Sequence, residues 1–121
     1  KGWDEVNDSH KLSSKSINCS YVRRAQRYIN NNYAKSITLE DVARHVKLNK
    51  CYLCNIFKKE TAKTCTQFIN EVRIEKSKEL LENTTMSILE VSLEVGFNNQ
   101  NYFNTIFKKL TNMTPLEYRN S

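Results

Sequence analysis

Thr38-Leu39-Glu40-Asp41-Val42-Ala43 recurs 49 residues later as Ser87-Ile88-Leu89-Glu90-Val91-Ser92. A second set of residues then returns 50 residues later: Tyr52, Ile56, Phe57, Lys58 and Lys59 reappear as Tyr102, Ile106, Phe107, Lys108 and Lys109. The change of offset indicates one inserted residue within 98–101, where a loop enters a helix and a change of length is tolerated. The chain therefore carries one helix-turn-helix pattern twice, at about 38–60 and 87–110, and each copy ends in a lysine pair. This suggests two equivalent contacts to one repeating polymer.

Helix boundaries follow from capping signals. Thr38 with Asp41, and Ser87 with Glu90, have the capping-box form that marks a helix start. They predict helices over 39–46 and 88–95. Asn49 and Asn98 are suitable N-caps for helices over 50–60 and 99–110. Gly96 lies where the second copy must reverse, a position suited to positive φ. The first copy has Lys47 there, so we expect its turn to be strained, to be shaped differently, or both.

Apolar spacing supplies the remaining elements. It predicts a first helix over 20–32 and a long helix over about 66–82 between the copies, roughly 25 Å at 1.5 Å per residue. Thr114-Pro115 predicts a short last helix that buries Leu116 and Tyr118. Strand-like alternation is absent from the sequence, so the expected fold class is all-α. The expected inward-facing residues of the duplicated helices are Leu39, Val42, Ala43, Val46, Leu53, Ile56 and Phe57, and Ile88, Val91, Ser92, Val95, Phe103, Ile106 and Phe107.

Composition sets the class of protein. The 121 residues fit one domain or two small subdomains, and 39% hydrophobic with 26% charged residues is ordinary for a globular protein. No apolar run approaches the roughly 20 residues of a membrane span, and no signal peptide is visible. Residues 1–18 show little apolar periodicity, so we expect a linker or disordered segment there and the domain over 19–121. Because the chain begins at Lys1 rather than Met, we expect an effector or receiver domain to precede it in a longer protein.

Charge and cysteine content point to partner and compartment. The net charge of +6 favours a polyanionic partner, although a solvated basic surface would also account for it. The four cysteines lack the regular spacing of a disulfide framework, so we interpret them as reduced thiols in the cytoplasm.

With its elements placed, the chain resembles the DNA-binding domain of the AraC/XylS family of bacterial transcription regulators over about residues 20–119. The matching motifs are Ile37-Thr38-Leu39-Glu40-Asp41-Val42-Ala43, Tyr52-Leu53, Ile56-Phe57-Lys58-Lys59-Glu60-Thr61, Arg73-Ile74, Leu80-Leu81, Ser87-Ile88, Val95-Gly96-Phe97, Tyr102-Phe103, Phe107-Lys108-Lys109, Thr114-Pro115 and Tyr118-Arg119. The resemblance implies seven helices, arranged as two helix-turn-helix units joined by the long helix. It also implies that each unit places its second helix in a major groove of double-stranded DNA, with RNA polymerase as a further partner.

The resemblance also implies site residues. The base-reading positions correspond to Cys51, Cys54 and Asn55 in the first copy, and to Gln100, Asn101, Asn104 and Thr105 in the second. The expected phosphate contacts are Lys50, Lys58, Lys59, Lys63, Lys108, Lys109 and Arg119. About six such contacts would make log affinity fall with log salt at a slope near −5. Amide side chains pair well with adenine and threonine with the thymine methyl, so we expect an A/T-leaning second half-site.

The sequence also departs from the family pattern at several positions. Asn55 and Thr105 stand where arginine is common in the family, so both faces lack that bidentate reader of guanine. Four further departures affect packing: Ala62 replaces a usual glycine, Cys65 a usual aromatic residue, and Ser77 and Ser92 usual alanines.

Two other functions compete with DNA binding. Cys51 and Cys54, with Cys65 and His45, could form a thiol or metal sensor, but a structural zinc site normally brings a second tight ligand pair. A helical protein-interaction module would leave unexplained why the exposed faces of both second helices lack large apolar residues. We expect no metal, no cofactor and no enzymatic activity, because His10 and His45 belong to no recognisable catalytic set.

Overall fold

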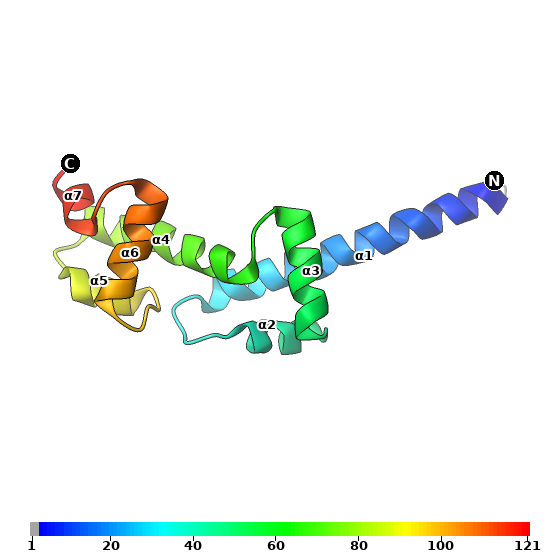
Figure 1. Cartoon of the computed structure of the whole chain (residues 1–121), viewed down its shortest axis with the longest axis horizontal. Coiled ribbons are helices and arrows are strands. Elements are labelled where there is room, and N and C mark those ends of the chain that lie inside the picture. The colour runs from blue at the N-terminus through cyan, green and yellow to red at the C-terminus, as the bar shows by residue number, and fades with distance from the viewer. Residues whose placement is uncertain (1–2) are drawn as a thin grey trace.

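The computed structural model describes residues 3–121, and side chains from residue 17 onward. Its helices are α1 (Trp3–Asn32), α2 (Leu39–Val46), α3 (Lys50–Thr61), α4 (Cys65–Asn83), α5 (Ile88–Glu94), α6 (Gln100–Thr111) and α7 (Pro115–Asn120). The described residues contain no strand, so the all-α class and the seven helices are confirmed (Figure 1). None of the described helices is both long and apolar enough to cross a membrane.

Most predicted boundaries hold to within one residue, and two need correction. The first helix begins at Trp3 rather than at residue 20, because an established helix gains one hydrogen bond for each added residue and needs no apolar periodicity to continue. The assignment of residues 1–18 to a linker stays a prediction. Asn99, not Asn98, caps α6. Since Asn99 matches Asn49, and Phe97 matches Leu48, the inserted residue is Asn98.

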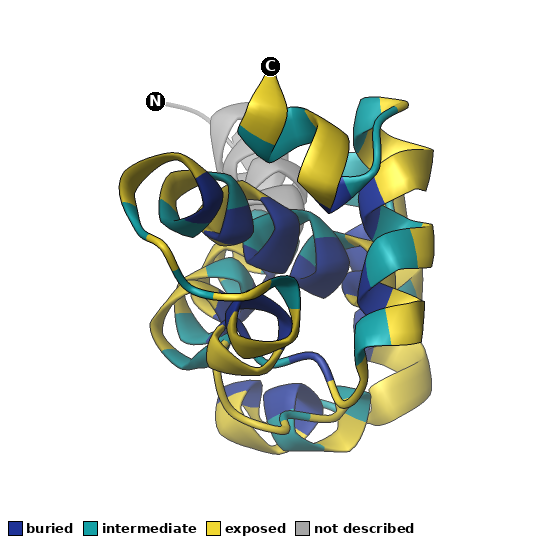
Figure 2. Cartoon of the chain, turned by 90° about the vertical axis from the view of Figure 1, so that its left-hand side faces the viewer, coloured by how far each residue is buried: buried dark blue, intermediate teal, exposed yellow. Residues whose placement is uncertain are grey.

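Two separate cores divide the molecule into two units. The first unit packs α2 and α3 against α1 and the start of α4, and the second packs α5, α6 and α7 against the rest of α4 (Figure 1). Figure 2 shows that the buried stretches lie on the sides of the helices that face other helices. The buried members of the first core are Val22, Ala25, Ile29, Val42, Ala43, Val46, Leu53, Ile56, Phe57, Cys65 and Ile69. Those of the second core are Ile74, Leu81, Val91, Val95, Phe97, Phe103 and Phe107. Helix α4 belongs to both units.

The duplication is longer than the sequence comparison indicated, because α1 and α4 are also equivalent. Val22, Ala25 and Ile29 are buried on α1, and residues 74, 77 and 81, each 52 positions later, are buried on α4. The start of α4 likewise matches α7. Phe57 packs edge-on against Phe68 at 5.6 Å between ring centroids, and Phe107 meets Tyr118 in the same way at 5.6 Å. Each unit is therefore a long helix, a helix-turn-helix and a closing helical turn.

This equivalence corrects the prediction for α7. Leu116 is 56% exposed rather than buried, and Pro115 takes the inward position together with half-buried Tyr118. Pro115 is equivalent to buried Cys65 at the start of α4. The inward residues of α7 are therefore Pro115 and Tyr118, three positions apart. The cap at Thr114 and the proline at the first helical position are confirmed.

The turns after α2 and α5 share one hydrogen-bond pattern. Leu48 N–H donates to Ala43 O at 3.0 Å, and Phe97 N–H donates to Ser92 O at 3.0 Å. Gly96 has φ +103°, while Lys47, with φ 63°, adopts the left-handed conformation that costs L-residues about 1 kcal/mol or more. The first turn therefore has the expected strain at Lys47 and keeps the hydrogen bonds of the second turn, although its φ differs from that of Gly96. The usual glycine position at Ala62 is also left-handed, with φ 64°.

The two serines that stand at usual alanine positions are buried with their hydroxyl groups paired. Ser77 and Ser92 are fully buried, and each hydroxyl donates to the carbonyl three residues earlier, at 2.6 and 2.7 Å respectively. Their polar groups are therefore satisfied inside the cores.

Capping boxes close the N-termini of α2, α4, α5 and α7. In α2, Asp41 N–H donates to Thr38 Oγ1 at 3.1 Å, and Thr38 N–H donates back to the Asp41 carboxylate at 3.0 Å. Backbone hydrogen bonds of this kind lower the pKa values of Asp41, Glu90 and Glu117 below their ordinary 3.8 to 4.5. The sequence predicted two of these boxes, at α2 and α5, and both are confirmed.

These lowered pKa values predict acid sensitivity. A carboxyl group with a lowered folded-state pKa stabilises the fold above its unfolded pKa, and this stabilisation is lost as pH falls through the folded value. We expect the free energy of unfolding to fall from about pH 5 to pH 3. The triple variant Asp41→Asn, Glu90→Gln, Glu117→Gln should show a shallower fall in urea titrations, because Gln67 in α4 already fills the same role without charge. If the free energy of unfolding fell with pH as steeply in this variant as in the wild type, the capping carboxylates would not be the source of the acid sensitivity.

Candidate nucleic-acid interface

Helix α3 presents the first expected reading face. Asn49 caps it by accepting hydrogen bonds from Cys51 N–H at 2.7 Å and Tyr52 N–H at 3.3 Å. The inward stripe holds the helix against α1 and α2, so the opposite side faces solvent. Cys51 and Asn55 are exposed on it, and Cys54 is half-buried between them. The first unit therefore offers one amide and two small thiols to a partner.

Helix α6 presents the second face with more hydrogen-bonding groups. Asn101 and Thr105 are exposed, and Gln100 and Asn104 are half-buried. The Thr105 hydroxyl donates to Asn101 O at 3.0 Å, which commits its proton within the helix. Asn104 Oδ1 is enclosed and has no hydrogen-bond partner. An unpaired buried oxygen of this kind costs about 1 to 3 kcal/mol, so a rotation of the Asn104 side chain that exposes Oδ1 to a donor would recover that cost.

Large apolar rings also reach the surface of both helices, which the sequence interpretation had excluded. Tyr52 is 45% exposed on α3, and Tyr102 is 44% exposed at the equivalent place on α6. Their hydroxyls are held by the long helices: Tyr52 donates to Asn18 Oδ1 at 2.9 Å, and Asn70 Nδ2 donates to Tyr102 Oη at 3.0 Å. The two asparagines are 52 residues apart, so aligning α1 with α4 would have revealed them.

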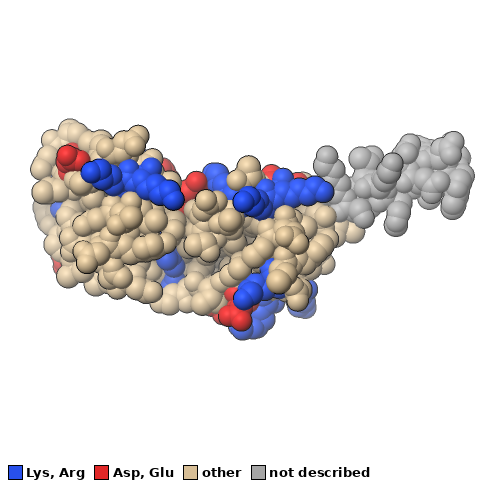
Figure 3. Space-filling view, in the orientation of Figure 1, with Lys and Arg blue, Asp and Glu red and all other residues tan. Residues whose placement is uncertain are grey.

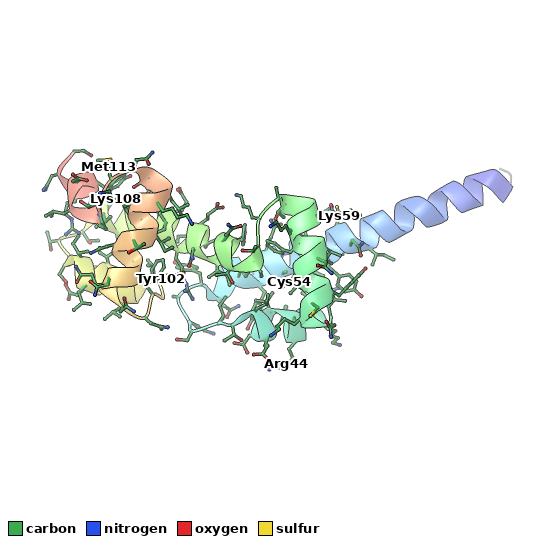
Figure 4. The ribbon with its side chains drawn as sticks, viewed as in Figure 1. Arg44, Cys54, Lys59, Tyr102, Lys108 and Met113 are labelled. Carbon is green, nitrogen blue, oxygen red and sulfur yellow. The ribbon has the colours of Figure 1, made fainter. Side chains whose placement is uncertain are left out.

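The lysine pairs lie at matching places. Lys58 and Lys59 lie in the last turn of α3, and Lys108 and Lys109 lie in the last turn of α6. Figure 3 shows Lys and Arg gathered over these two helix ends and again near α2, with the middle of both helices mainly uncharged. In Figure 4, Lys59 and Lys108 lie at the same end of their helices, and Cys54 and Tyr102 lie further down. Each face thus has an uncharged middle and a basic end.

Two of the expected phosphate contacts have intramolecular partners. Lys63 Nζ lies 2.6 Å from the Glu71 carboxylate. Arg119 donates to Leu81 O at 3.1 Å and to Thr84 O at 3.2 Å, across the end of α4. Among the described residues, no carboxylate lies within ion-pairing distance of the other five, which are Lys50, Lys58, Lys59, Lys108 and Lys109.

The cysteines do not form a metal centre in the described part of the chain. Cys65 is buried, and burial, together with the neighbouring Cys54, raises the pKa of its thiol to about 12, which disfavours the thiolate that binds metals. His45 is exposed and stacks on Tyr28 at 4.3 Å between ring centroids. No three His, Cys, Asp or Glu side chains among the described residues are grouped as a metal site requires.

One helix, α4, connects the two units that carry these faces. In Figure 1, α3 and α6 stand beside different parts of α4 and run in similar directions, and both face the viewer. With 19 residues, α4 is about 28 Å long. The arrangement therefore presents two similar surfaces, each with an uncharged middle and a basic end, along one side of the molecule.

Comparison with known proteins identifies this arrangement. A helix-turn-helix domain family model matches residues 42–121. The chain is 44% identical over 109 residues to an uncharacterized HTH-type transcriptional regulator in the cgkA 5′ region of Pseudoalteromonas carrageenovora, covering 90% of this chain and 64% of that protein. It is 35% identical over 123 residues to the melibiose operon regulatory protein of Escherichia coli K12, covering 98% of this chain and 41% of that protein.

A solved structure agrees with these relatives. The C-terminal domain of AraT, a response regulator from Geobacillus stearothermophilus, superposes with a TM-score of 0.79 at 37% identity, covering 83% of this chain and 84% of that one. The chain thus spans about 64% and 41% of the two curated relatives but most of this domain. These relatives are named as regulators, and none is named as an enzyme. The chain belongs to the AraC/XylS family of helix-turn-helix transcription regulators and carries its DNA-binding domain.

Proposed function

We propose that this domain binds double-stranded DNA sequence-specifically, with α3 and α6 in successive major grooves on one side of the duplex. The observation that carries the proposal is that two equivalent helices of one chain each present a solvent-facing side with an uncharged middle and a lysine pair near the C-terminal end. Successive major grooves on one side of B-DNA lie about 34 Å apart. A connector of about 28 Å, plus the width of the two units, is long enough to span that distance.

The two units are expected to contribute unequally. Gln100, Asn101 and Asn104 supply amides that can pair with adenine, and the methyl group of Thr105 can contact thymine. The first unit offers Asn55 and two thiols, so its share of the affinity comes more from lysine contacts to the backbone. We therefore propose an A/T-leaning second half-site and a less selective first one. Selection from random DNA that returned a G/C-rich second half-site would overturn this assignment.

This division of labour predicts different effects of two substitutions. Gln100→Ala removes a base-reading amide, so affinity for the selected site should fall roughly tenfold, with little change for unrelated DNA. Lys58→Ala removes one phosphate contact, so affinity should fall similarly for all sequences and the salt slope should lose about one unit. Competition gel shifts with selected and scrambled DNA measure both effects.

Lys78→Ala provides the matched control for charge, because Lys78 is paired with Glu75 on α4 at 2.8 Å. Its effect on affinity should be small for both kinds of DNA. If Gln100→Ala and Lys58→Ala weakened selected and scrambled DNA in the same proportion, the assignment of base-reading and phosphate-binding roles would be wrong.

We further propose that the complete protein regulates transcription in the bacterial cytoplasm, as an activator that contacts RNA polymerase. A further domain would supply the signal. One relative is named for an operon and another is called a response regulator, so both a small-molecule sensor and a receiver domain fit this role. Sequencing the DNA that the full-length protein binds in cells tests this, and a strain that lacks its gene supplies the background control. Absence of promoter enrichment would contradict it.

A further inference from the structure

The two units are tied together by a small cluster that has no counterpart inside either unit. We call it the inter-unit clamp, and it consists of Tyr33, Lys35, Arg73, Gly96 and Phe97. Arg73, on α4, donates from Nε to Tyr33 O at 2.8 Å and from a terminal guanidinium nitrogen to Lys35 O at 2.9 Å. Both carbonyls belong to the α1–α2 loop of the first unit.

The other side of the clamp belongs to the second unit. The Arg73 guanidinium lies over the Phe97 ring, 5.6 Å from its centroid, and the Tyr33 side chain packs against the second core. Gly96 brings its backbone so close that an added Cβ would lie 2.2 Å from Tyr33 O. Arg73 therefore links a loop of one unit to a turn of the other.

Arg73 is 9% exposed and has no carboxylate partner among the described residues. Burial lowers the pKa of its guanidinium from the ordinary value, and the two carbonyls and the ring replace water around it. A buried cation without a counter-ion is costly unless its donors are satisfied. Its hydrogen bonds therefore fix the loop in one position.

The first unit has no equivalent of the clamp within its own fold. At the equivalent places the first unit has Tyr21 instead of Arg73 and Lys47 instead of Gly96, yet it has the same helices and its own core. The clamp residues are thus specialised for the joint between units.

From these contacts we propose that Arg73 is a positioning residue that fixes the relative orientation of α3 and α6 and thereby sets which half-site spacing the domain accepts. This inference rests on the proposed function. Each added base pair moves one half-site about 3.4 Å along the duplex and turns it by roughly 35°. A rigid joint cannot follow that displacement, whereas a loosened joint can follow part of it.

The test uses the DNA site selected by this chain and versions with one base pair inserted or deleted between the half-sites. We expect the wild-type chain to lose roughly 100-fold in affinity on either change, and Arg73→Met to lose only about tenfold relative to its own best site. Arg73→Lys, which keeps the charge, gives a milder second variant and should lie between them. Arg24→Met removes the same charge from an exposed arginine of α1 and should keep the wild-type spacing preference.

The outcomes separate the two proposals. If the wild-type chain selected no DNA, the proposed function itself would fail. If it bound a selected site, and Arg73→Met and Arg73→Lys remained folded by circular dichroism but kept the full wild-type penalty for both spacing changes, the role of Arg73 would be refuted. In that case α4 alone would hold the two units in register.

Discussion

Gly96→Ala should lower the free energy of unfolding by about 3 to 5 kcal/mol and the melting temperature by roughly 10 to 20 °C. Two costs add. An alanine at φ +103° is strained, by about 1 to 2 kcal/mol. The new Cβ would also lie 2.2 Å from Tyr33 O and 2.9 Å from Arg73 Nε, so the hydrogen bond between those two groups must break or shift. Breaking a hydrogen bond of a buried charged group costs a further 1.5 to 3 kcal/mol.

Lys47→Gly is the matched control, because Lys47 has the equivalent position and the same turn hydrogen bonds but is exposed. Removing its side chain relieves the left-handed strain, so this variant should gain about 0.5 to 1 kcal/mol. Urea titrations of both variants measure the two changes. If Gly96→Ala were as stable as the wild type, the turn after α5 would not make the close contact with Tyr33 O of the first unit.

Affinity for DNA should fall steeply with salt. Five lysines have no ion-pairing partner in the described part of the chain, so if each neutralises one phosphate, the slope of log affinity against log salt is about −4.5. Between 50 and 200 mM salt this corresponds to a loss of roughly 500-fold. Fluorescence anisotropy with a labelled duplex across that range measures the slope.

The double variant Lys108→Ala, Lys109→Ala should bring the slope to about −2.7, because two of the five contacts are removed. A slope near zero for the wild type would contradict a groove-bound complex. A slope that stayed at −4.5 in the double variant would place the phosphate contacts elsewhere on the surface.

Local features made much of this fold predictable. The capping boxes at Thr38 and Ser87 and the cap at Asn49 fixed the starts of α2, α5 and α3, because each satisfies amides of its own first turn. Apolar spacing placed the inward stripes. The full extent of the duplication was not predicted, since α1 and α4 share burial more than residue identity, and burial becomes visible only in the packed molecule.

The candidate site was predictable to a smaller degree. The exposure of Cys51, Asn55, Asn101 and Thr105 follows from helical geometry once the stripes are placed. The hydrogen-bond and ion-pair partners of long side chains do not follow from helical geometry. Lys63 pairs with a carboxylate eight residues away, and Arg119 reaches carbonyls more than thirty residues away. Arg73 and Gly96 both stand in motifs of the family resemblance, but the sequence does not show that long-range packing brings them together in the clamp.

The central claim is that one chain places both recognition helices on one duplex. Chemical footprinting of major-groove base edges and backbone, on the site selected from random DNA, tests it most directly. The account predicts two protected major-groove segments, centred about 10 base pairs apart on the same side of the duplex, at a stoichiometry of one chain per site. Protection of a single segment by one chain, or of two segments on opposite sides of the duplex, would contradict it.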